Sequence, residues 1–383
     1  MDLRWSESEE AFRAEVRGWL AANVPRGLPS GDTRDGFAAH LDWERRLYDA
    51  RWAVVSWPER YGGRDASRWE WLIFEEEYHR AGAPQRVTQN GIFLLAPTLF
   101  EFGTQEQRDR LLPRMASAQD LWCQGWSEPG AGSDLAAVRS KAVRDQARGG
   151  WLLSGQKTWT TRGAFCTHMF GLFRSDPAAG RHKGLTYFLV PLDATGVTVR
   201  GFERLDGDEG FADVFLDEVF VPDENVLGPV GEGWRVAMAT TGSERGLTLR
   251  SPGRFLAAAE RLIALYRERP AADGRAAARD RVVDSWIDAK AYQFFTLQQV
   301  TASAHEVSSL NKLFWSELDV RLHETAMDLL GPDSEVDGPW PRGFMFSLAG
   351  PIYAGTNEVQ RNIVAERLLG LPRPSAQPTP LAR

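Results

Sequence analysis

The chain has 383 residues, enough for two or three domains with their own cores, and its 43% hydrophobic and 25% charged content is ordinary for a globular protein. A net charge of -7 argues against nucleic acid or an anionic membrane as a partner. The charged start "MDLRWSESEEAFRAEV", the lack of a long apolar run and only two cysteines favour a cytoplasmic protein without a signal peptide, membrane span or disulfide framework.

Residues 1–119 read as helices. Ser6 and Glu9 have the spacing of a capping box, and Phe12, Val16 and Leu20 follow at helical intervals. The segments "RWEWLIFEEEYHRAG" and "TQEQRDRLLPRMAS" also have helical patterns, and Pro and Gly separate them from their neighbours. We therefore expect an N-terminal helical domain.

Residues 120–229 have a different character. The segments "GWLLSGQKTWTT", "HMFGLFRS", "GLTYFLVPL", "GVTVRGF" and "ADVFLDEVFV" are short, rich in β-branched and aromatic residues, and separated by turn residues. This pattern predicts a middle β domain, either a barrel or a sandwich.

Helical periodicity returns in residues 230–372, from "GWRVAMATTGSER" to "EVQRNIVAERLLGL", and predicts a C-terminal four-helix bundle. The Pro-rich end, residues 373–383, is expected to be a flexible tail. The predicted fold class is thus a multidomain α+β protein in the order helices, β domain, helices.

Several common kinds of site are missing from the sequence. The six histidines lie far apart, and no HExxH or paired Cys/His spacing predicts a metal. There is no G-x-S-x-G elbow, no P-loop and no GxGxxG fingerprint after a strand, so a Rossmann NAD site is not expected.

Three segments could carry chemistry. In "WCQGWSEPGAGSDLA", residues 122–136, two glycines permit a close backbone approach; the alternative is a tight loop entering the β domain. In "GQKTWTTRGA", residues 155–164, a Trp beside two Thr suits a flat heteroaromatic ligand; the alternative is a half-exposed strand. In "TTGSERGL", residues 240–247, Glu244 follows an apolar helical stretch, and an isolated helical Glu is usually a solvated surface residue.

A fourth segment, "GPIYAGTNEVQRN" at residues 350–362, combines a turn, an aromatic residue and a dense polar run. It has the composition of a site, yet Ala354 stands at its centre and supplies no carboxylate for proton transfer.

Together these motifs resemble the acyl-CoA dehydrogenase family over nearly the whole chain. "SEPGAGSD", "GQKTWTT" and "IYAGTNEVQRNIVAERLLGLPR" occur in the family's order and spacing. The resemblance implies FAD as cofactor, a tetrameric assembly and the three-domain fold already predicted. It also implies an acyl-CoA or carrier-bound acyl substrate and an electron-transfer flavoprotein as the electron acceptor.

The resemblance assigns roles to individual residues. Trp159 and Thr161 match the Trp and Thr beside the flavin, and Thr356 and Glu358 match positions near the adenosine half of FAD. In the family, the segment that matches residues 124–133 lines the flavin and the acyl thioester. The resemblance places Ser133 near the substrate, and the matching residues of this segment are Gln124, Trp126, Ser127, Gly132 and Ser133.

The implied reaction is α,β-desaturation, in which a carboxylate removes the α-proton while a hydride leaves the β-carbon for flavin N5. Most family members carry the base directly before "GT", where this chain has Ala354. A minority carry it on a C-terminal helix before an Arg, a position that matches Glu244 followed by Arg245. We expect Glu244 to be the base, Arg245 to contact substrate, and the backbone N–H of Ala354 to polarise the thioester carbonyl.

Two departures from the family concern the FAD diphosphate. The Arg-x-x-Phe-Gly string of many homotetrameric members is absent, and "DLLGPDS" places Asp328 and Pro332 where those members have Gln and Gly. One explanation is an α2β2 heterotetramer in which a paralogous subunit supplies these contacts; the other is a homotetramer that uses different arginines. In addition, Pro252-Gly253 is expected to break or kink the helix that carries Glu244.

Two other functions remain open from the sequence. One is a flavin oxidase or monooxygenase on the same fold, and the other is a non-catalytic subunit of a heteromeric acyl-CoA dehydrogenase. The carboxylate at Glu244 favours the dehydrogenase over both.

Overall fold

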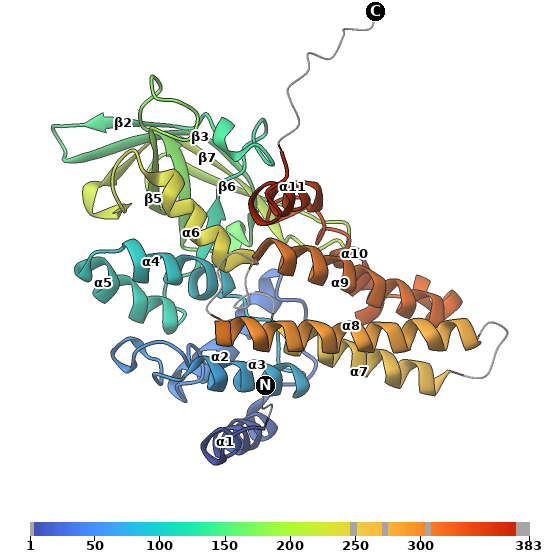
Figure 1. The fold of residues 1–383 in the computed structure, drawn as a ribbon. Coiled ribbons are helices and arrows are strands. Elements are labelled where there is room, and N and C mark those ends of the chain that lie inside the picture. Colours follow the sequence, from blue (N-terminus) through green and yellow to red (C-terminus); the bar gives the residue numbers. More distant parts are fainter. Residues whose placement is uncertain (1–3, 246–250, 270–274, 303–307, 373–383) are drawn as a thin grey trace, which may run out of the picture.

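The computed structural model describes residues 4–245, 251–269, 275–302 and 308–372. A helical N-terminal part is followed by one β-sheet domain and a helical C-terminal part, which confirms the predicted fold class (Figure 1). Over these residues, no helix combines the length and apolar character that crossing a membrane requires.

The N-terminal helices begin at residues that cap them. Ser6 and Glu9 form the predicted capping box, with the Ser6 amide donating to Glu9 Oε2 at 2.7 Å, and Thr104 forms another with Gln107. This part contains α1 (Glu7–Asn23), α2 (Arg34–Asp49), α3 (Arg68–Arg80), the π-helical turn η2 (Asn90–Leu95), α4 (Ala96–Phe102) and α5 (Gln105–Ala116).

The middle part is an eight-stranded sheet in the order β6-β7-β3-β2-β4-β5-β8, with β1 pairing parallel to β4. The longest pair, β3 and β7, is antiparallel and contains register shifts between Lys157 and Thr160. The strands are β1 (Trp122–Gly125), β2 (Lys141–Asp145), β3 (Gly150–Thr161), β4 (His168–Arg174), β5 (Leu185–Pro191), β6 (Val197–Phe202), β7 (Phe211–Pro222) and β8 (Val226–Leu227).

Strands β4 and β5 are buried on both faces. Phe170 and Tyr187 belong to the core shared with the N-terminal helices, whereas their neighbours Met169 and Phe188 belong to a second core on the opposite face. This alternation follows from the two-residue period of a strand. It fixes one face of the sheet against the N-terminal helices, which is where the cavity described below opens.

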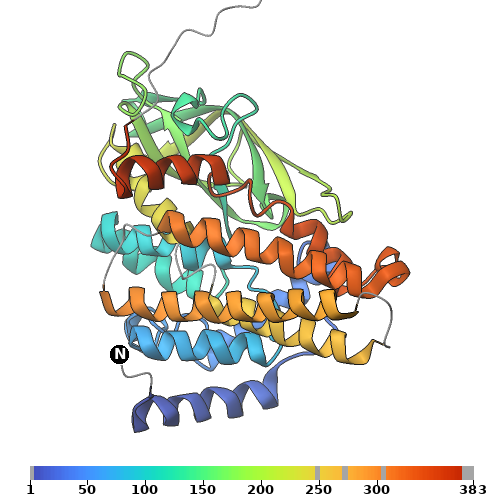
Figure 2. The same cartoon turned by 45° about the vertical axis from the view of Figure 1, so that its right-hand side comes forward.

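The C-terminal helices are long, and α8 and α9 lie side by side with α11 between α9 and the sheet (Figure 2). Pro252 is the first residue of α7 and Ser251 caps it, so the preceding helix ends before Pro252, as the sequence predicts. These helices are α6 (Gly233–Arg245), α7 (Pro252–Glu268), α8 (Arg275–Ala302), α9 (Ser308–Leu330), α10 (Pro339–Ser347) and α11 (Asn357–Ile363), which continues as the π-helical turn η8 (Val364–Leu368).

Helix α6 connects the three parts. The fully buried Thr240 Oγ1 lies 2.8 Å from Thr98 Oγ1 of α4 and 3.3 Å from the Tyr187 hydroxyl of β5. Buried hydroxyls that hydrogen-bond to one another favour one arrangement of α4, α6 and β5, because separating them would leave polar atoms unpaired. Helix α6 continues from this contact toward position 244.

Candidate active site

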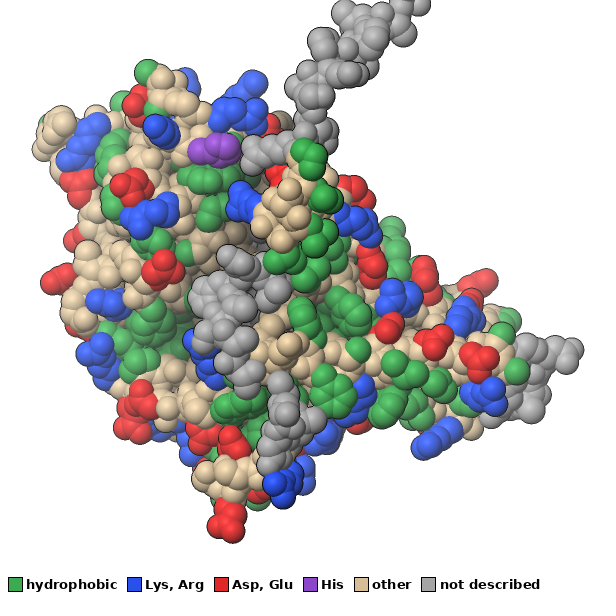
Figure 3. Space-filling view, viewed as in Figure 1, with side chains coloured by type: hydrophobic (Ala, Val, Ile, Leu, Met, Phe, Trp, Pro, Cys, Tyr) green, Lys and Arg blue, Asp and Glu red, His purple; other side chains and the backbone are tan. Residues whose placement is uncertain are grey.

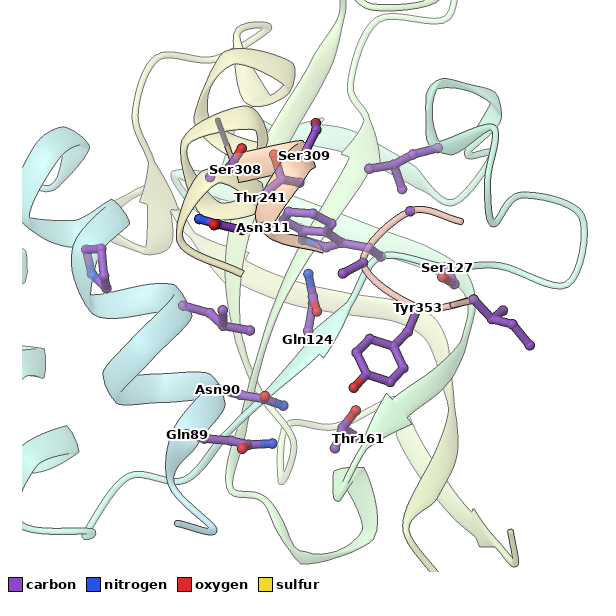
Figure 4. A pocket seen from close by; sticks show the side chains of 18 of the residues that line it. Gln89, Asn90, Gln124, Ser127, Thr161, Thr241, Ser308, Ser309, Asn311 and Tyr353 are labelled. Carbon is purple, nitrogen blue, oxygen red and sulfur yellow. The ribbon is translucent and has the colours of Figure 1, made fainter. Parts of the chain in front are cut away.

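A cavity of about 1890 Å³ lies where the three parts of the chain meet. Figure 4 shows that side chains from all three parts project into it: Gln89, Asn90, Gln124, Thr161, Thr241 and Tyr353. Single ligand pockets typically measure about 300–1,000 Å³. The cavity is therefore large enough for two ligands side by side.

Trp159 forms a flat wall of this cavity. Its backbone has φ 58° at a register shift of β3, and the residue is 60% exposed. Phe202 and Phe211 support the indole edge-on, with ring centroids 5.2 and 5.5 Å away. An exposed ring that is supported in this way at a left-handed position offers a stacking surface to a planar ligand, and the flat heteroaromatic ligand expected from the sequence stays a prediction.

The loop after β1 is fixed by a buried ion pair that sequence reasoning missed. Lys157 is fully buried, and its Nζ lies 2.8 Å from Glu128 Oε1 and 2.7 Å from the Leu172 carbonyl oxygen. The Ser127 carbonyl also accepts from the Thr158 amide at 2.9 Å. The only available signal was a lysine at an inward position of the strand "GQKTWTT".

The ion pair shifts the pKa of both partners. Burial opposes ionisation of Glu128, but the Lys157 charge and hydrogen bonds hold the pKa of the Glu128 carboxyl below its ordinary value. Burial lowers the pKa of Lys157, and the Glu128 charge counteracts that effect. Glu128 also accepts from the backbone amides of Arg139 and Ser140, so its carboxylate holds both ends of the loop.

Most predicted residues of the first two motifs do line the cavity. Gln124 and Ser127 are half-buried in its wall, and Trp126 is buried with its ring packed edge-on against Phe170 and Tyr187. The structure brings together Gln124, Trp126, Ser127, Gly132, Ser133, Trp159 and Thr161. Their individual roles stay predictions.

A second charged cluster borders the same cavity and was also missed. Asp32 accepts from Arg162 Nε at 2.5 Å and from Arg204 Nη1 at 2.6 Å, and Arg204 also donates to Asp206 at 2.8 Å. Burial opposes ionisation of Asp32, but the two guanidinium groups lower the pKa of its carboxyl overall. Sequence reasoning could not find it because Asp32 and Arg204 are 172 residues apart in the chain, a separation that no local pattern spans.

The turn at residues 353–355 places Ala354 in the cavity wall. Ala354 has φ 57°, a conformation that is costly for a residue with a Cβ, and its carbonyl accepts from Gln360 Nε2 at 3.0 Å. Tyr353 stacks on the buried Trp315 with ring centroids 5.8 Å apart. Both contacts fix the orientation of the Ala354 peptide.

The other predicted residues of this segment lie outside the wall. Thr356 caps α11 by accepting from the Val359 amide, and the Glu358 side chain is 79% exposed. Neither is among the described residues that line the cavity, and their contact with the adenosine half of FAD stays a prediction. Sequence reasoning overlooked Asn357, whose Oδ1 accepts from the buried Lys312 at 2.6 Å and anchors α11 to α9.

The last turn of α6 contains the predicted base. Thr241 and Gly242 line the cavity, and position 244 follows Thr241 by three residues, a spacing that puts two positions on one side of a helix. The side chains of Glu244 and Arg245 lie outside the described residues. Asp328, one of the two family departures, is paired with Arg281 at 2.5 Å, and neither Asp328 nor Pro332 is among the described lining residues.

Family models match almost the whole chain. The N-terminal domain of acyl-CoA dehydrogenases matches residues 6–119, the middle domain residues 123–219 and the C-terminal domain residues 231–369. The chain belongs to the acyl-CoA dehydrogenase family. It is therefore an enzyme of this family, and the three matched domains correspond to the helical, sheet and helical parts of the fold.

Two similar proteins come from Mycobacterium tuberculosis. The chain is 41% identical over 381 residues to acyl-CoA dehydrogenase IpdE1 of Mycobacterium tuberculosis, covering 95% of this chain and 98% of that one. It is 37% identical over 348 residues to acyl-CoA dehydrogenase FadE34 of the same organism, covering 88% of this chain and 47% of that one.

Solved structures of this family share the fold. The steroid acyl-CoA dehydrogenase Tcur3481-Tcur3483 has a TM-score of 0.84 and 26% identity, covering 98% of this chain and all of that one. The ChsE4-ChsE5 complex of Mycobacterium tuberculosis has a TM-score of 0.82 and 27% identity, with the same coverage.

The Glu128–Lys157 ion pair predicts a stability effect that depends on pH. Glu128→Gln leaves Lys157 buried without a counter-charge, so we expect the free energy of unfolding at pH 7 to fall by about 3–5 kcal/mol. Because the folded-state pKa of Glu128 is lowered, its stabilisation is present above the ordinary value of 4.5 and disappears as pH falls through the folded pKa. Urea unfolding at pH 7 and pH 3.5 measures both effects.

A matched control is Glu224→Gln, because Glu224 and its partner Arg110 are both exposed. That variant should change the free energy of unfolding by less than about 1 kcal/mol. A loss in Glu128→Gln that stays equally large at both pH values would contradict the role of the ionised carboxylate.

Proposed function

We propose that the chain catalyses α,β-desaturation of an acyl-CoA thioester with FAD as cofactor, and that its cavity holds the flavin and the acyl group together. The observation that carries this proposal is the meeting of Trp159, Thr161, Thr241 and Ala354 in one cavity of about 1890 Å³. FAD, when bound, supplies the acceptor for the hydride that leaves the β-carbon.

The residues of the sheet suit the flavin ring. Trp159 offers an exposed flat surface, and the amide of Gln124 and the hydroxyls of Ser127 and Thr161 can pair with polar atoms at the ring edge. The buried Lys157–Glu128 pair keeps this wall in place without meeting the ligand. We assign Gly132 and Ser133 to the wall beside the flavin, with Ser133 facing the substrate. We assign Thr356 and Glu358 to the adenosine half of FAD.

Glu244 is the proposed base, with Arg245 contacting the substrate beside it. The α-proton of a thioester is a weak acid, so the base needs a pKa moved toward neutrality, which burial beside an apolar acyl group provides. The last turn of α6 is suited to this role because Thr241 and Gly242 already line the cavity. Ala354, at the position of the usual base, has no group that could take a proton.

Ala354 is proposed to help in a different way. Its backbone N–H can donate to the thioester oxygen while negative charge develops there, and loss of one such donor costs about 2.7–4 kcal/mol in comparable sites. Because Gln360 holds the Ala354 carbonyl and Trp315 supports Tyr353, this donor is oriented before the substrate arrives. One residue thus polarises the carbonyl and another removes the proton.

The relatives guide the proposed substrate and partners. Since one similar structure is described as a steroid acyl-CoA dehydrogenase, we propose a bulky acyl group, delivered by CoA, and an electron-transfer flavoprotein as the acceptor of the electrons. We further propose a heterotetramer with a paralogous subunit, in line with the ChsE4-ChsE5 complex. The cytoplasm is the proposed location.

The surface of the C-terminal helices supports an assembly. On α8, Val283, Trp286, Ile287 and Phe294 are exposed, and hydrophobic side chains gather over the C-terminal helices in Figure 3. Exposed apolar patches of this kind mark interaction surfaces. Acidic Asp328 at the family's diphosphate-binding position also fits a chain that relies on a partner for that contact.

The base assignment predicts a half-reaction defect. Glu244→Gln should retain bound FAD and ligand affinity, yet bleach the flavin at least about 1,000-fold more slowly with a saturated acyl-CoA under anaerobic conditions, because no group takes the α-proton. Glu268→Gln, which changes an exposed glutamate of α7, is the matched control and should bleach normally. Near-normal bleaching in Glu244→Gln would exclude this residue as the base.

The heterotetramer predicts how FAD is retained. Purified alone, the chain should hold less than one FAD per subunit, whereas co-purification with its paralogous subunit should give full occupancy and a particle of four chains. Flavin absorbance and light scattering measure both quantities. Full occupancy in the chain alone would support a homotetramer instead.

A further inference from the structure

One face of α9 supports the turn that carries Ala354. Lys312, Trp315 and Ser316 have the i, i+3, i+4 spacing that puts three side chains on one side of a helix, and all three are fully buried. Trp315 stacks on Tyr353, the residue directly before Ala354, with ring centroids 5.8 Å apart. We call Lys312, Trp315 and Ser316 the α9 cradle, because they hold the beginning of the turn through this contact and its end through the contacts described next.

The end of the turn is held through the buried side chain of Asn357. Lys312 Nζ donates to Asn357 Oδ1 at 2.6 Å. The Ser316 hydroxyl lies 3.1 Å from the same oxygen and 3.2 Å from the Leu313 carbonyl oxygen, between which it shares its proton. The backbone amide of Asn357 donates to the Pro351 carbonyl at 2.9 Å, which closes the turn. The contact with Lys312 is therefore the strongest side-chain contact that fixes Asn357 and, through it, the closed turn.

Lys312 is a fully buried cation to which the proposed reaction has so far given no role. Burying an ammonium group is costly unless hydrogen bonds compensate the lost hydration, and a charge-assisted hydrogen bond is roughly twice as strong as a neutral one. A neutral side chain of similar length, such as methionine, would fill the same space at a lower desolvation cost. A lysine at this position indicates that the hydrogen bonds of its ammonium group matter more than packing alone.

The turn needs this support because its backbone is strained. Ala354 and Gly355 have φ 57° and 81°, a left-handed conformation that only glycine adopts without cost. Such a conformation persists only where the surrounding contacts determine it. The α9 cradle holds Tyr353 on one side of this pair and Asn357 on the other, while Ala354 lies in the cavity wall. A relaxation of the turn would rotate the Ala354 peptide and redirect its N–H.

We propose that the α9 cradle positions the Ala354 N–H for the reaction, and that Lys312 is the positioning residue on which this alignment depends most. The inference rests on the proposed desaturation, in which that N–H donates to the thioester oxygen. Among the described residues that line the cavity, none belongs to the α9 cradle. Lys312 thus acts through Asn357 and the turn, and does not contact the thioester.

Lys312→Met tests the proposal, because it keeps the length of the side chain and removes the donor. The FAD-loaded enzyme, together with its partner subunit where that is needed for FAD, is mixed anaerobically with 3-cyclohexylpropanoyl-CoA. Flavin bleaching at saturating thioester should slow by about 10–100-fold, because a small misplacement of a reacting group can cost about 100-fold in rate. The half-saturating concentration should change by less than about 3-fold, since the aligned donor acts mainly on the transition state.

An infrared measurement reports the alignment of the donor directly. The product 3-cyclohexylpropenoyl-CoA, with ¹³C at the thioester carbonyl, is bound to the oxidised enzyme, and the carbonyl stretch is read from the isotope difference spectrum. A hydrogen bond to the carbonyl oxygen lowers this frequency, so the unaltered enzyme should give a lower value than water does. In Lys312→Met the frequency should return toward the value in water. A loss of stability alone would not move the frequency.

Two further variants keep the result interpretable. Ser316→Ala removes the weaker contact to Asn357 Oδ1 and should change the rate and the carbonyl frequency in the same direction by a smaller amount, even if Lys312→Met does not fold. Thr325→Val is the matched control on α9, because its buried hydroxyl donates to the Arg321 carbonyl at 2.8 Å and does not contact the turn. That variant should leave both quantities unchanged even if it lowers stability.

The two readouts separate this inference from the proposed function. If the unaltered enzyme lowers the carbonyl frequency and Lys312→Met does not, but the saturated thioester never bleaches the flavin, the desaturation fails while the positioning role stands. If the flavin bleaches normally and both α9 cradle variants keep the rate and the frequency of the unaltered enzyme, the function stands and the inference fails. A carbonyl frequency in the unaltered enzyme equal to that in water, or an equal change in Thr325→Val, would also overturn the inference.

Discussion

The buried hydroxyls of Thr98, Thr240 and Tyr187 hold α4, α6 and β5 together, and the shape of the cavity depends on this contact. The cavity walls come from parts of the chain that are distant in sequence, so none of them forms the site alone. Since α6 begins at the sheet and ends at the cavity, a small rotation about its fixed point would move position 244 by much more than it moves Thr240. Satisfied buried hydrogen bonds resist such a rotation because breaking them leaves polar atoms unpaired.

The walls of the site combine strained backbone with strong local support. Trp159 and Ala354 both adopt a left-handed conformation that a residue with a Cβ normally avoids. Each costs of order 1–3 kcal/mol and persists only where neighbouring contacts determine it. Phe202 and Phe211 provide those contacts at Trp159, and Gln360 provides them at Ala354. A flavin-stacking surface and an oriented N–H donor are roles that would benefit from such fixed geometry.

A base on α6, instead of at position 354 where most family members carry it, is compatible with the rest of the site. In the proposed mechanism the turn keeps its backbone donor, and α6 supplies the carboxylate from another direction. Two groups on separate elements can then be positioned independently, one toward the carbonyl oxygen and the other toward the α-carbon.

Much of the fold was predictable because its signals are local. The capping box at Ser6, the twelve-residue strand ending at Thr161 and the helix starting at Gly233 follow from residue spacing and turn residues. The cavity wall was predictable where a motif is continuous, as in "SEPGAGSD". The family resemblance, more than residue physics, supplied the roles assigned to those positions.

The missed features are those that depend on tertiary contacts. Lys157 is a single basic residue in a strand, and only the fold shows that Glu128 compensates its burial. Asp32 and Asn90 occupy ordinary helical or loop segments, and nothing in the sequence brings them to the cavity that the 124–161 region also lines. Asn357 was passed over in favour of Thr356 and Glu358 because burial, which distinguishes it, cannot be read from a dense polar run.

The division of labour between Glu244 and Ala354 is the central claim, and a crystal structure of the FAD-loaded enzyme with a bound 2-enoyl-CoA tests it most directly. The thioester oxygen should lie within about 3.2 Å of the Ala354 nitrogen, with the α-carbon facing the Glu244 carboxylate. A thioester oxygen held by other donors, or an α-carbon that faces a different carboxylate, would contradict it.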